Sequence, residues 1–355
     1  MNFQYSKIIL LAAFLFFHTS HAQDAIDAPV KKPTTPLFAD QNILPLKMSF
    51  SLKKLRKLTN DSTYMPSKIW YAEAPDEWKE LDLQVRVRGN FRKNNCYFTP
   101  IKFKIKKKQA KGTVFEGEKL LKLVVPCLKE SVKNDNVIKE LMAYKIYELI
   151  SPYHFKTRMV DIEFEDVKTK RSVVHNIKGF LIEDDKSVAK RHGGKVSKRP
   201  IPPLGYDPNE CVRNAMFQFM IGNTDWSATY QHNMKLMFVD KRFILVPYDF
   251  DMAGLVNSSY AVVSQVRGNQ LPIDDVKQRL FVGYQRDDAI FHANKEMYLA
   301  KRQEIFEALK PFEAYFENKR SYKAAIDYLH EFYDVLNNEK RFERDIIARA
   351  KKHKQ

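Results

Sequence analysis

The spacing of apolar residues constrains the fold of this chain more than any other feature. Between residues 46 and 105 apolar residues recur at every second position, which is the period of a half-buried β-strand. LDLQVRVRG, residues 81–89, places alternate apolar side chains on one side, and PIKFKIK, residues 100–106, alternates apolar residues with lysines. KLLKLVVP, residues 119–126, is a third strand candidate. These segments predict an antiparallel sheet with one apolar face and one cationic face.

The period changes to 3.6 in residues 134–150, NDNVIKELMAYKIYELI. This spacing predicts a helix with one apolar face, and the asparagines at its start are suitable caps. Two further strand candidates follow, at residues 157–167 and 175–185. A basic loop with Gly-Gly and Pro-Pro, residues 189–209, then marks a boundary.

Beyond this boundary the pattern is mainly helical. The elements expected here are a helix at 209–221, strands at 234–239 and 242–251, and helices through 294–352 with breaks near Pro311 and Asn337. We therefore predict an α+β chain with two lobes. Residues 46–186 would form a lobe built on the antiparallel sheet, and residues 187–355 a mainly helical lobe.

The first 22 residues have the pattern of a secretory signal peptide. They contain one lysine, an apolar run over residues 8–17 and a small-residue ending at Ala22, after which cleavage is expected. The alternative is a membrane anchor, but the run is about half of the ~20 residues needed to span a bilayer. Residues 23–45, rich in Pro, Ala and Asp, predict a flexible linker. We expect an exported chain, periplasmic or extracellular, with no transmembrane segment after cleavage.

The charge of the chain is strongly positive, with 60 Lys and Arg against 43 Asp and Glu and a net charge of +17. Export and the lack of a zinc-finger or RNP signature argue against a nucleic-acid partner. The charge fits an acidic or phosphorylated ligand or partner surface, or simple solubility.

Three cysteines are present in a chain that we expect to be exported. An oxidising compartment favours one disulfide and one free thiol. Cys96 and Cys127 each lie at the end of a strand candidate, so they could face one another on neighbouring strands, and we predict that they are linked. Cys211 lies on the face of a predicted helix and is expected to be a buried free thiol.

Common catalytic motifs are missing from the chain. GTVFEGEKL resembles a phosphate-binding loop, but Glu118 stands where that loop needs its lysine. No GxGxxG, HExxH or GxSxG is present, and the histidines share no metal-ligand spacing. Zinc chemistry, dinucleotide cofactors and serine hydrolysis are therefore poorly supported.

Two polar segments favour phosphoryl transfer. GNTDWSATYQHNMK contains Asp225 and Asn233, and VPYDFDMAG contains Asp249 and Asp251. Phosphoryl transfer needs a lysine for the phosphates, oxygen ligands for Mg²⁺ and a carboxylate that orients the acceptor hydroxyl. Asp249 and Asp251 flank Phe250, so on a strand both would point to one side. Two carboxylates on one side favour a cation between them.

Five segments within residues 80–260 carry a family resemblance: RVRGNFRK, KFKIK, GFLIEDD, GNTDW…HN and VPYDFDMAG. In this order they resemble the spore coat protein H kinase family, in the divergent branch abundant among exported proteins of Bacteroidetes-type bacteria. The resemblance implies an atypical protein kinase with a bilobal kinase-like fold. Such an enzyme uses ATP and a divalent metal, Mg²⁺ or Mn²⁺, to phosphorylate Ser or Thr of a protein substrate, here an exported one.

The resemblance also implies roles for the residues of the second lobe. Asp225 takes the place of the catalytic-loop aspartate, and Asn233 that of an amide on the metal side. Asp249 would be the main metal ligand and Asp251 a secondary one. Asp225 and Asn233 are further apart than the corresponding pair of protein kinases, and Asp251 replaces a glycine.

In the first lobe the resemblance leaves the lysine that contacts ATP open. Lys104 is our choice, with Lys102 and Lys122 as alternatives, because alternation alone does not separate them. By position, Glu183 would lie in the segment that connects the two lobes, where this segment passes the adenine of ATP. The segment RGN would shape the lobe near the phosphates, through Arg88 and Asn90.

Two functions follow from these observations, and the sequence leaves both open. The first is an exported kinase, and the second is a secreted binding or scaffold protein that keeps the fold without catalysis. The absence of a glycine-rich loop over the nucleotide favours the second.

Overall fold

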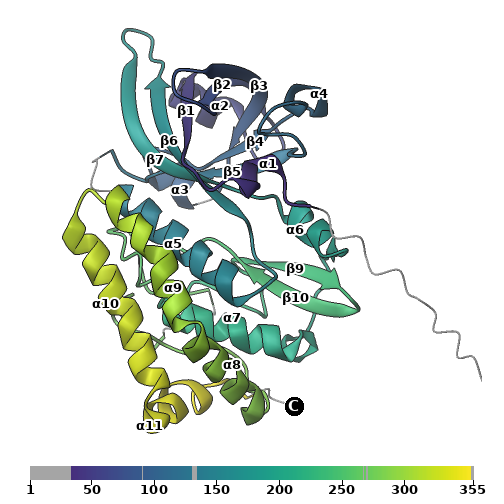
Figure 1. The fold of residues 1–355 in the computed structure, drawn as a ribbon, viewed down its shortest axis with the longest axis vertical. Helices are drawn as coiled ribbons and strands as arrows, with labels where there is room; N and C mark the ends of the chain where they lie inside the picture. Colours follow the sequence, from purple (N-terminus) through teal and green to yellow (C-terminus); the bar gives the residue numbers. More distant parts are fainter. Residues whose placement is uncertain (1–32, 90, 130–133, 267, 269–270, 353–355) are drawn as a thin grey trace, which may run out of the picture.

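The computed structural model describes residues 33–352 with the exception of 90, 130–133, 267 and 269–270 (Figure 1). The predicted signal peptide, residues 1–22, and the first part of the expected linker, residues 23–32, lie outside the described residues. No helix within the described part of the chain is both long and apolar enough to cross a membrane.

The fold is α+β, and its first half is a closed β-barrel (Figure 1). The strands follow one another around the barrel in the order β1-β2-β3-β4-β5-β7-β6. Their bounds are β1 Leu44–Phe50, β2 Met65–Ala72, β3 Trp78–Val87, β4 Ile101–Lys104, β5 Leu120–Val124, β6 Thr157–Asp166 and β7 Val173–Ile182. Every pairing is antiparallel except β1 with β6, which is parallel. The predicted antiparallel sheet is thus a mixed barrel, and closure removes the exposed strand edges of an open sheet.

The strand that closes the barrel begins in a segment that we expected to be a flexible linker. Residues 36–45 are structured: Pro36–Ala39 form helix α1, and β1 starts at Leu44. Leu37 and Phe38 are buried in the core of the barrel. Arg158 of β6 donates hydrogen bonds to the carbonyl oxygens of Leu37 and Asn42, at 3.2 and 2.9 Å. The burial of two large apolar side chains outweighs the linker-like composition of this segment.

The alternation in the sequence accounts for the barrel interior. Apolar side chains of β3 and β4 point inward; they are Leu81, Leu83, Val85, Val87, Ile101 and Phe103. The basic residues between them, Arg86, Lys102 and Lys104, face outward. The prediction of an apolar face and a cationic face is confirmed for these strands.

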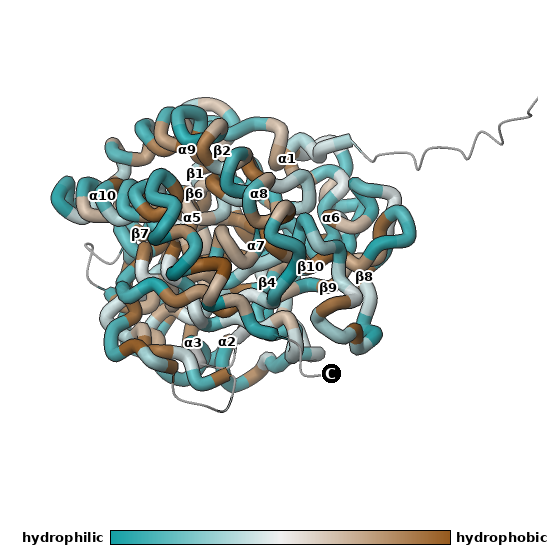
Figure 2. Tube along the Cα trace, turned by 90° about the horizontal axis from the view of Figure 1, so that it is seen from below, coloured by the Kyte–Doolittle hydropathy of each residue, from teal (hydrophilic) through white to brown (hydrophobic). Residues whose placement is uncertain are grey.

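Helix α5, Asn134–Ile150, has the bounds that the sequence predicts and lies below the barrel (Figure 1). It belongs to a second core, which it shares with α7, Pro208–Met220, and the C-terminal helices. In Figure 2 the apolar stretches of α5 and α7 lie toward the middle of the molecule, while the outer loops are mainly hydrophilic. The C-terminal helices are α8 Asp288–Ala300, α9 Arg302–Leu309, η3 Lys310–Tyr315, α10 Lys319–Leu336 and α11 Glu339–Phe342.

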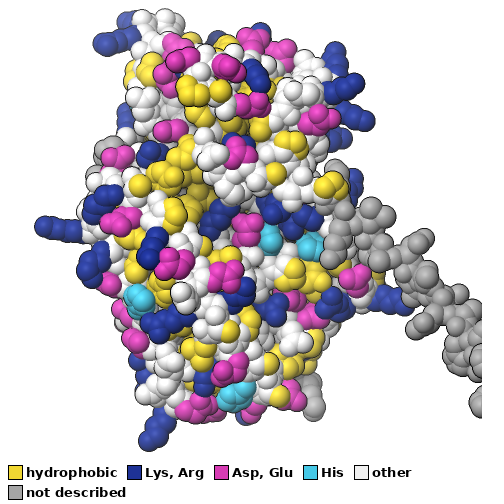
Figure 3. All heavy atoms as spheres, in the orientation of Figure 1, with side chains coloured by type: hydrophobic (Ala, Val, Ile, Leu, Met, Phe, Trp, Pro, Cys, Tyr) yellow, Lys and Arg dark blue, Asp and Glu magenta, His cyan; other side chains and the backbone are white. Residues whose placement is uncertain are grey.

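A second sheet lies beside α7 and consists of β8 Lys195–Val196, β9 Met234–Val239 and β10 Arg242–Pro247. Short helices fill the connections, namely α2 Leu52–Leu58, α3 Phe91–Asn95, α4 Lys107–Ala110, α6 Asp185–Arg191 and η2 Pro203–Gly205. On the face drawn in Figure 3, Lys and Arg side chains are interspersed with acidic ones from one end of the molecule to the other.

The cysteines have the arrangement that the sequence predicts. Cys96, after α3, forms a disulfide with Cys127, after β5, and Cys211 on α7 is a buried free thiol.

Candidate functional site

Most of the residues singled out in the sequence line one cleft of about 700 Å³. The cleft lies between the outer face of the barrel and the loops that flank β9 and β10. The predicted residues in its lining are Arg88, Lys102, Lys122, Asp225, Asn233, Asp249 and Asp251. Among these predicted residues the basic ones lie on or directly after barrel strands, whereas the carboxylates and the amide come from the loops. Lys235 of β9 also lines the cleft.

Lys122 is the most distinctive group on the barrel side. Its side chain is 5% exposed, and its Nζ has no hydrogen-bond partner among the residues that the structure describes. The ammonium lies 4.4 Å from the ring centre of Phe155 and 5.1 Å from that of Tyr248. Burial lowers the pKa of Lys122 to about 8. A buried ammonium without a hydrogen-bond partner is costly, which favours an anionic ligand here.

The other two candidate lysines are placed differently. Lys102 is paired with Lys122 in the register of β4 and β5, but its Nζ lies 3.5 Å from Asp184 Oδ1. Lys104 is exposed and does not line the cleft; its Nζ lies 5.3 Å from the ring centre of Tyr64. All three lysines belong to the outer face of the barrel, and Lys122 is the one that Phe155 and Tyr248 cover.

Asp225 lies in the loop after α7 and is held by several neighbours. Asn233 Nδ2 donates to its Oδ2 at 3.0 Å, and Ser264 Oγ donates to its Oδ1 at 2.9 Å. His232 Nε2 lies 3.4 Å from Oδ1. The loop leaves α7 at Gly222, which has φ +64° and whose Cβ would lie 1.9 Å from Tyr328 Oη, so only glycine fits. The structure thus brings Asp225 and Asn233 into direct contact.

Asp249 and Asp251 both reach the cleft, but not for the reason that strand alternation suggests. β10 ends at Pro247, and Asp249 has a left-handed φ of 67°, so the two aspartates do not lie on a strand. Phe250 between them is fully buried against Tyr144 and Phe217. The burial of this ring, rather than the pleat of a strand, directs both carboxylates toward the cleft.

The donors near Asp249 suit a divalent ion that arrives with a phosphate ligand. Within the described ranges no group of three or more His, Cys, Asp or Glu is arranged to hold a metal. Mg²⁺, however, is usually bound by one or two carboxylates together with substrate phosphates, rather than by a cage of protein ligands. Asp249, Asp251 and the amide oxygen of Asn233 are hard oxygen donors of this kind.

Arg92 is a residue of the cleft that our sequence reasoning missed. It is 7% exposed, and its Nη2 donates to Val125 O at 2.6 Å. Its Nη1 lies 3.8 Å from Glu140 Oε2 on α5, and its Nε lies 3.7 Å from Asp251 Oδ2. The only signal for Arg92 in the sequence is its place in RVRGNFRK, because nothing in the period of this segment indicates a buried charge.

The carboxyls beside Arg92 are unusual because they are buried. Burial, followed by the charge of Asp251, raises the pKa of Glu140 to about 8. Burial raises the pKa of Asp251 to about 6, although Arg92 acts in the opposite direction. Tyr260 donates a hydrogen bond of 3.0 Å to Asp251 Oδ2. Glu140 therefore faces Arg92 rather than Lys122.

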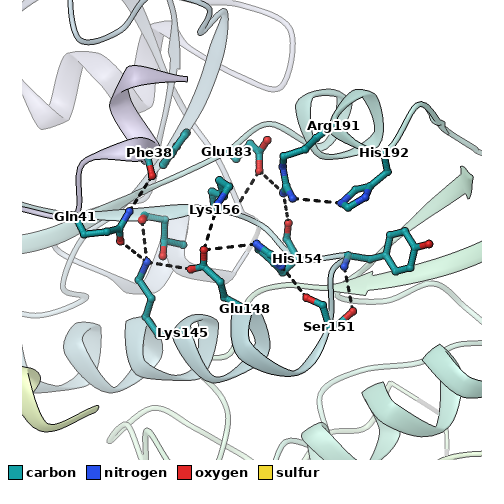
Figure 4. Close-up of polar contacts among 12 residues, drawn as sticks. Phe38, Gln41, Lys145, Glu148, Ser151, His154, Lys156, Glu183, Arg191 and His192 are labelled. Carbon is teal, nitrogen blue, oxygen red and sulfur yellow. Dashed lines mark hydrogen bonds and ion pairs between the residues drawn. The ribbon is translucent and has the colours of Figure 1, made fainter. Parts of the chain in front are cut away.

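Glu183 lies outside the cleft, in a separate polar cluster (Figure 4). Its Oε2 accepts hydrogen bonds from Arg191 Nη2 at 2.9 Å and from the backbone N–H of Lys156 at 3.1 Å. These contacts tie α6 to the start of β6, and Glu183 is not among the residues that line the cleft. The neighbouring Asp185 lines the cleft instead. Asn90, the remaining predicted residue, is outside the described residues.

Comparison with known proteins adds no assignment: no protein-family model matches the chain, and no curated protein matches it in sequence. The chemistry of the cleft therefore stands on its own geometry. An unpaired buried ammonium faces a group of oxygen donors across a volume large enough for a small ligand. This arrangement suits a phosphorylated ligand with a divalent ion.

Proposed function

We propose that the chain is an exported protein kinase similar to the spore coat protein H family, which transfers phosphate from ATP to Ser or Thr of an exported protein. The observation that carries the proposal is the buried ammonium of Lys122 opposite Asp225, Asn233 and Asp249 in one cleft. Protein kinases place a strand lysine at the phosphates, an aspartate at the acceptor hydroxyl and a second aspartate at the metal. Lys122 replaces Lys104 as our candidate for the ATP lysine.

The order of elements gives further support to a kinase-like arrangement. Lys122 lies on the strand directly before α5, and α5 carries Glu140. In kinases the lysine strand is likewise followed by a helix with a glutamate. The disulfide between Cys96 and Cys127 supports export, since disulfides persist in oxidising compartments.

In the proposed reaction five residues of the cleft have defined roles. Lys122, with Arg88, would bind the phosphates, and Asp249 with Asn233 would hold the divalent ion, which would supply positive charge to neutralise the phosphates. Asp225 orients the acceptor hydroxyl. The hydroxyl oxygen bonds to the γ-phosphorus, the bond from this phosphorus to the bridging oxygen breaks with departure of ADP, and the hydroxyl proton passes to Asp225.

The test is transfer of label from ATP in the presence of Mg²⁺ or Mn²⁺, with γ- and α-labelled ATP in parallel. We expect label from γ-ATP only, and a loss of at least about 100-fold in Asp225→Asn, the scale for removing a positioned base. Nucleotide affinity should stay within a few-fold, since Asp225 is assigned to the acceptor. Incorporation of the α-label would indicate nucleotidyl transfer instead.

A second function, a secreted binding or scaffold protein, is favoured by one specific observation. Glu140 pairs with Arg92 rather than with Lys122, so the lysine–glutamate pair of active kinases is not formed. Nucleotide binding without transfer to the chain itself or to any exported protein would support this second function.

A further inference from the structure

The buried environment of Asp251 differs from that of Asp249. Asp251 Oδ2 faces two donors, Arg92 Nε at 3.7 Å and the Tyr260 hydroxyl at 3.0 Å. The same three residues line a small cavity of about 10 Å³, together with Glu140. Such a volume has room for about one water molecule and none for a hydrated ion.

Arg92 places one positive charge between two buried carboxyls, with its Nη1 3.8 Å from Glu140 Oε2 and its Nε 3.7 Å from Asp251 Oδ2. Asp251 therefore has a cationic neighbour without any added ion. Asp249, by contrast, is only half-buried, and the described residues contribute no ion pair to it within 4 Å. Asp249 is therefore the carboxylate that remains open to an added cation in the cleft, whereas Asp251 already has Arg92 beside it.

We propose that Arg92 is a built-in cation that pairs with Asp251 and withholds it from metal, so that the cleft takes one divalent ion, at Asp249. Protein kinases commonly use two Mg²⁺ ions at the corresponding place. Arg92 would stand in for one of them with a fixed charge, and Asp251 would be a positioning residue and not a metal ligand. This inference rests on the proposed nucleotide cleft but not on phosphoryl transfer.

The test is a calorimetric titration with Mn²⁺ of the protein saturated with a non-hydrolysable ATP analogue. Wild type should bind one Mn²⁺ in total per protein–nucleotide complex, after subtraction of the Mn²⁺ taken up by the excess free nucleotide in control titrations. Asp249→Asn should lose at least about tenfold in Mn²⁺ affinity, the scale for disturbing a metal site, whereas Asp251→Asn should change it less than about threefold. Equal losses in the two variants would overturn the proposal.

Removal of Arg92 gives the converse measurement. Arg92→Met should raise Mn²⁺ affinity by about tenfold or add a second ion, because a positive charge beside two carboxyls is lost. In that background Asp251→Asn should reverse the gain. Arg86→Met is the matched control, since Arg86 lies at the same cleft but pairs with the exposed Asp61. If Arg92→Met does not fold, the comparison of Asp249→Asn with Asp251→Asn still decides.

The outcomes separate this inference from the proposed function. A wild-type protein that binds one Mn²⁺ with the nucleotide but transfers no phosphate contradicts the kinase and leaves the role of Arg92 intact. If wild type binds two Mn²⁺ ions, or binds none at millimolar Mn²⁺, the role proposed for Arg92 is contradicted even if phosphate is transferred.

Discussion

At the scale of single residues, Lys122 shows how a binding group can reduce stability. The charged ammonium is buried at a cost, so folding lowers the pKa of Lys122 from 10.5 to about 8. Below about pH 8 both states carry the proton and the whole cost is present. Between about 8 and 10.5 the folded state gives up its proton first, so stability rises with pH in this window. Sites that bind ligands commonly carry such a cost.

Replacement of Lys122 by methionine should therefore stabilise the protein without ligand. We expect Lys122→Met to raise the free energy of unfolding at pH 7 by up to about 3 kcal/mol, with no gain above about pH 10.5. The same variant should lose the stabilisation that ATP with Mg²⁺ gives to wild type. Urea unfolding at pH 7 and at high pH measures both effects. Lys104→Met, which changes an exposed lysine, is the control, and its free energy of unfolding should stay within about 0.5 kcal/mol of wild type. A Lys122→Met protein less stable than wild type at pH 7 would contradict the argument that burial of the ammonium is costly.

At the scale of elements, the disulfide fastens helix α3 to the segment after β5. Cys96 and Cys127 are separated by 31 residues, and the link is reinforced by a hydrogen bond of 2.8 Å from Tyr97 N–H to Cys127 O. Arg92, on the same helix, donates to Val125 O. The residue that pairs with Asp251 therefore sits on an element with both covalent and polar attachments to the barrel.

Removal of the disulfide should cost stability without detaching this helix. Replacement of both Cys96 and Cys127 by alanine should lower the free energy of unfolding by about 3–4 kcal/mol, from the entropy of the opened loop. The hydrogen bonds of Tyr97 and Arg92 should keep α3 in place, so nucleotide affinity should change little. Denaturant titration and peptide mapping under non-reducing conditions are the measurements. Recovery of Cys96 and Cys127 as free thiols from exported protein would refute the bridge.

At the scale of the whole molecule, a polar cluster joins α5, the start of β6 and α6, so it connects the barrel to the second core (Figure 4). His154 in this cluster is almost fully buried, with Nδ1 2.7 Å from Ser151 O and Nε2 3.6 Å from Glu148 Oε1. Burial lowers the pKa of His154 to about 4. Lys156 and Arg191 lie nearby and also disfavour a second positive charge.

The protein should consequently lose stability in mild acid. Between pH 6.5 and about 4 the unfolded chain binds a proton at His154 that the folded protein does not, so acid favours unfolding in this window. The contribution is up to about 3 kcal/mol, and His154→Gln should remove it and flatten the pH profile. Urea unfolding at pH 7, 5.5 and 4.5 measures the slope, with the exposed His292→Gln as control. An unchanged slope in His154→Gln would show that His154 does not control acid stability.

The sequence by itself determined the local elements and the identity of most polar residues of the cleft. Period-two alternation identified the inward side chains of β3 and β4, and period 3.6 identified α5, because each repeat directs apolar groups to one face. It could not choose among Lys102, Lys104 and Lys122, since alternation places all three outside the barrel and only the packing of Phe155 and Tyr248 against Lys122 decides which is buried. Likewise, closure of the barrel by β1, the inward turn at Asp249 and the burial of Arg92 depend on contacts between residues far apart in the chain. Such contacts leave no periodic trace in the sequence, so only the tertiary structure decided them.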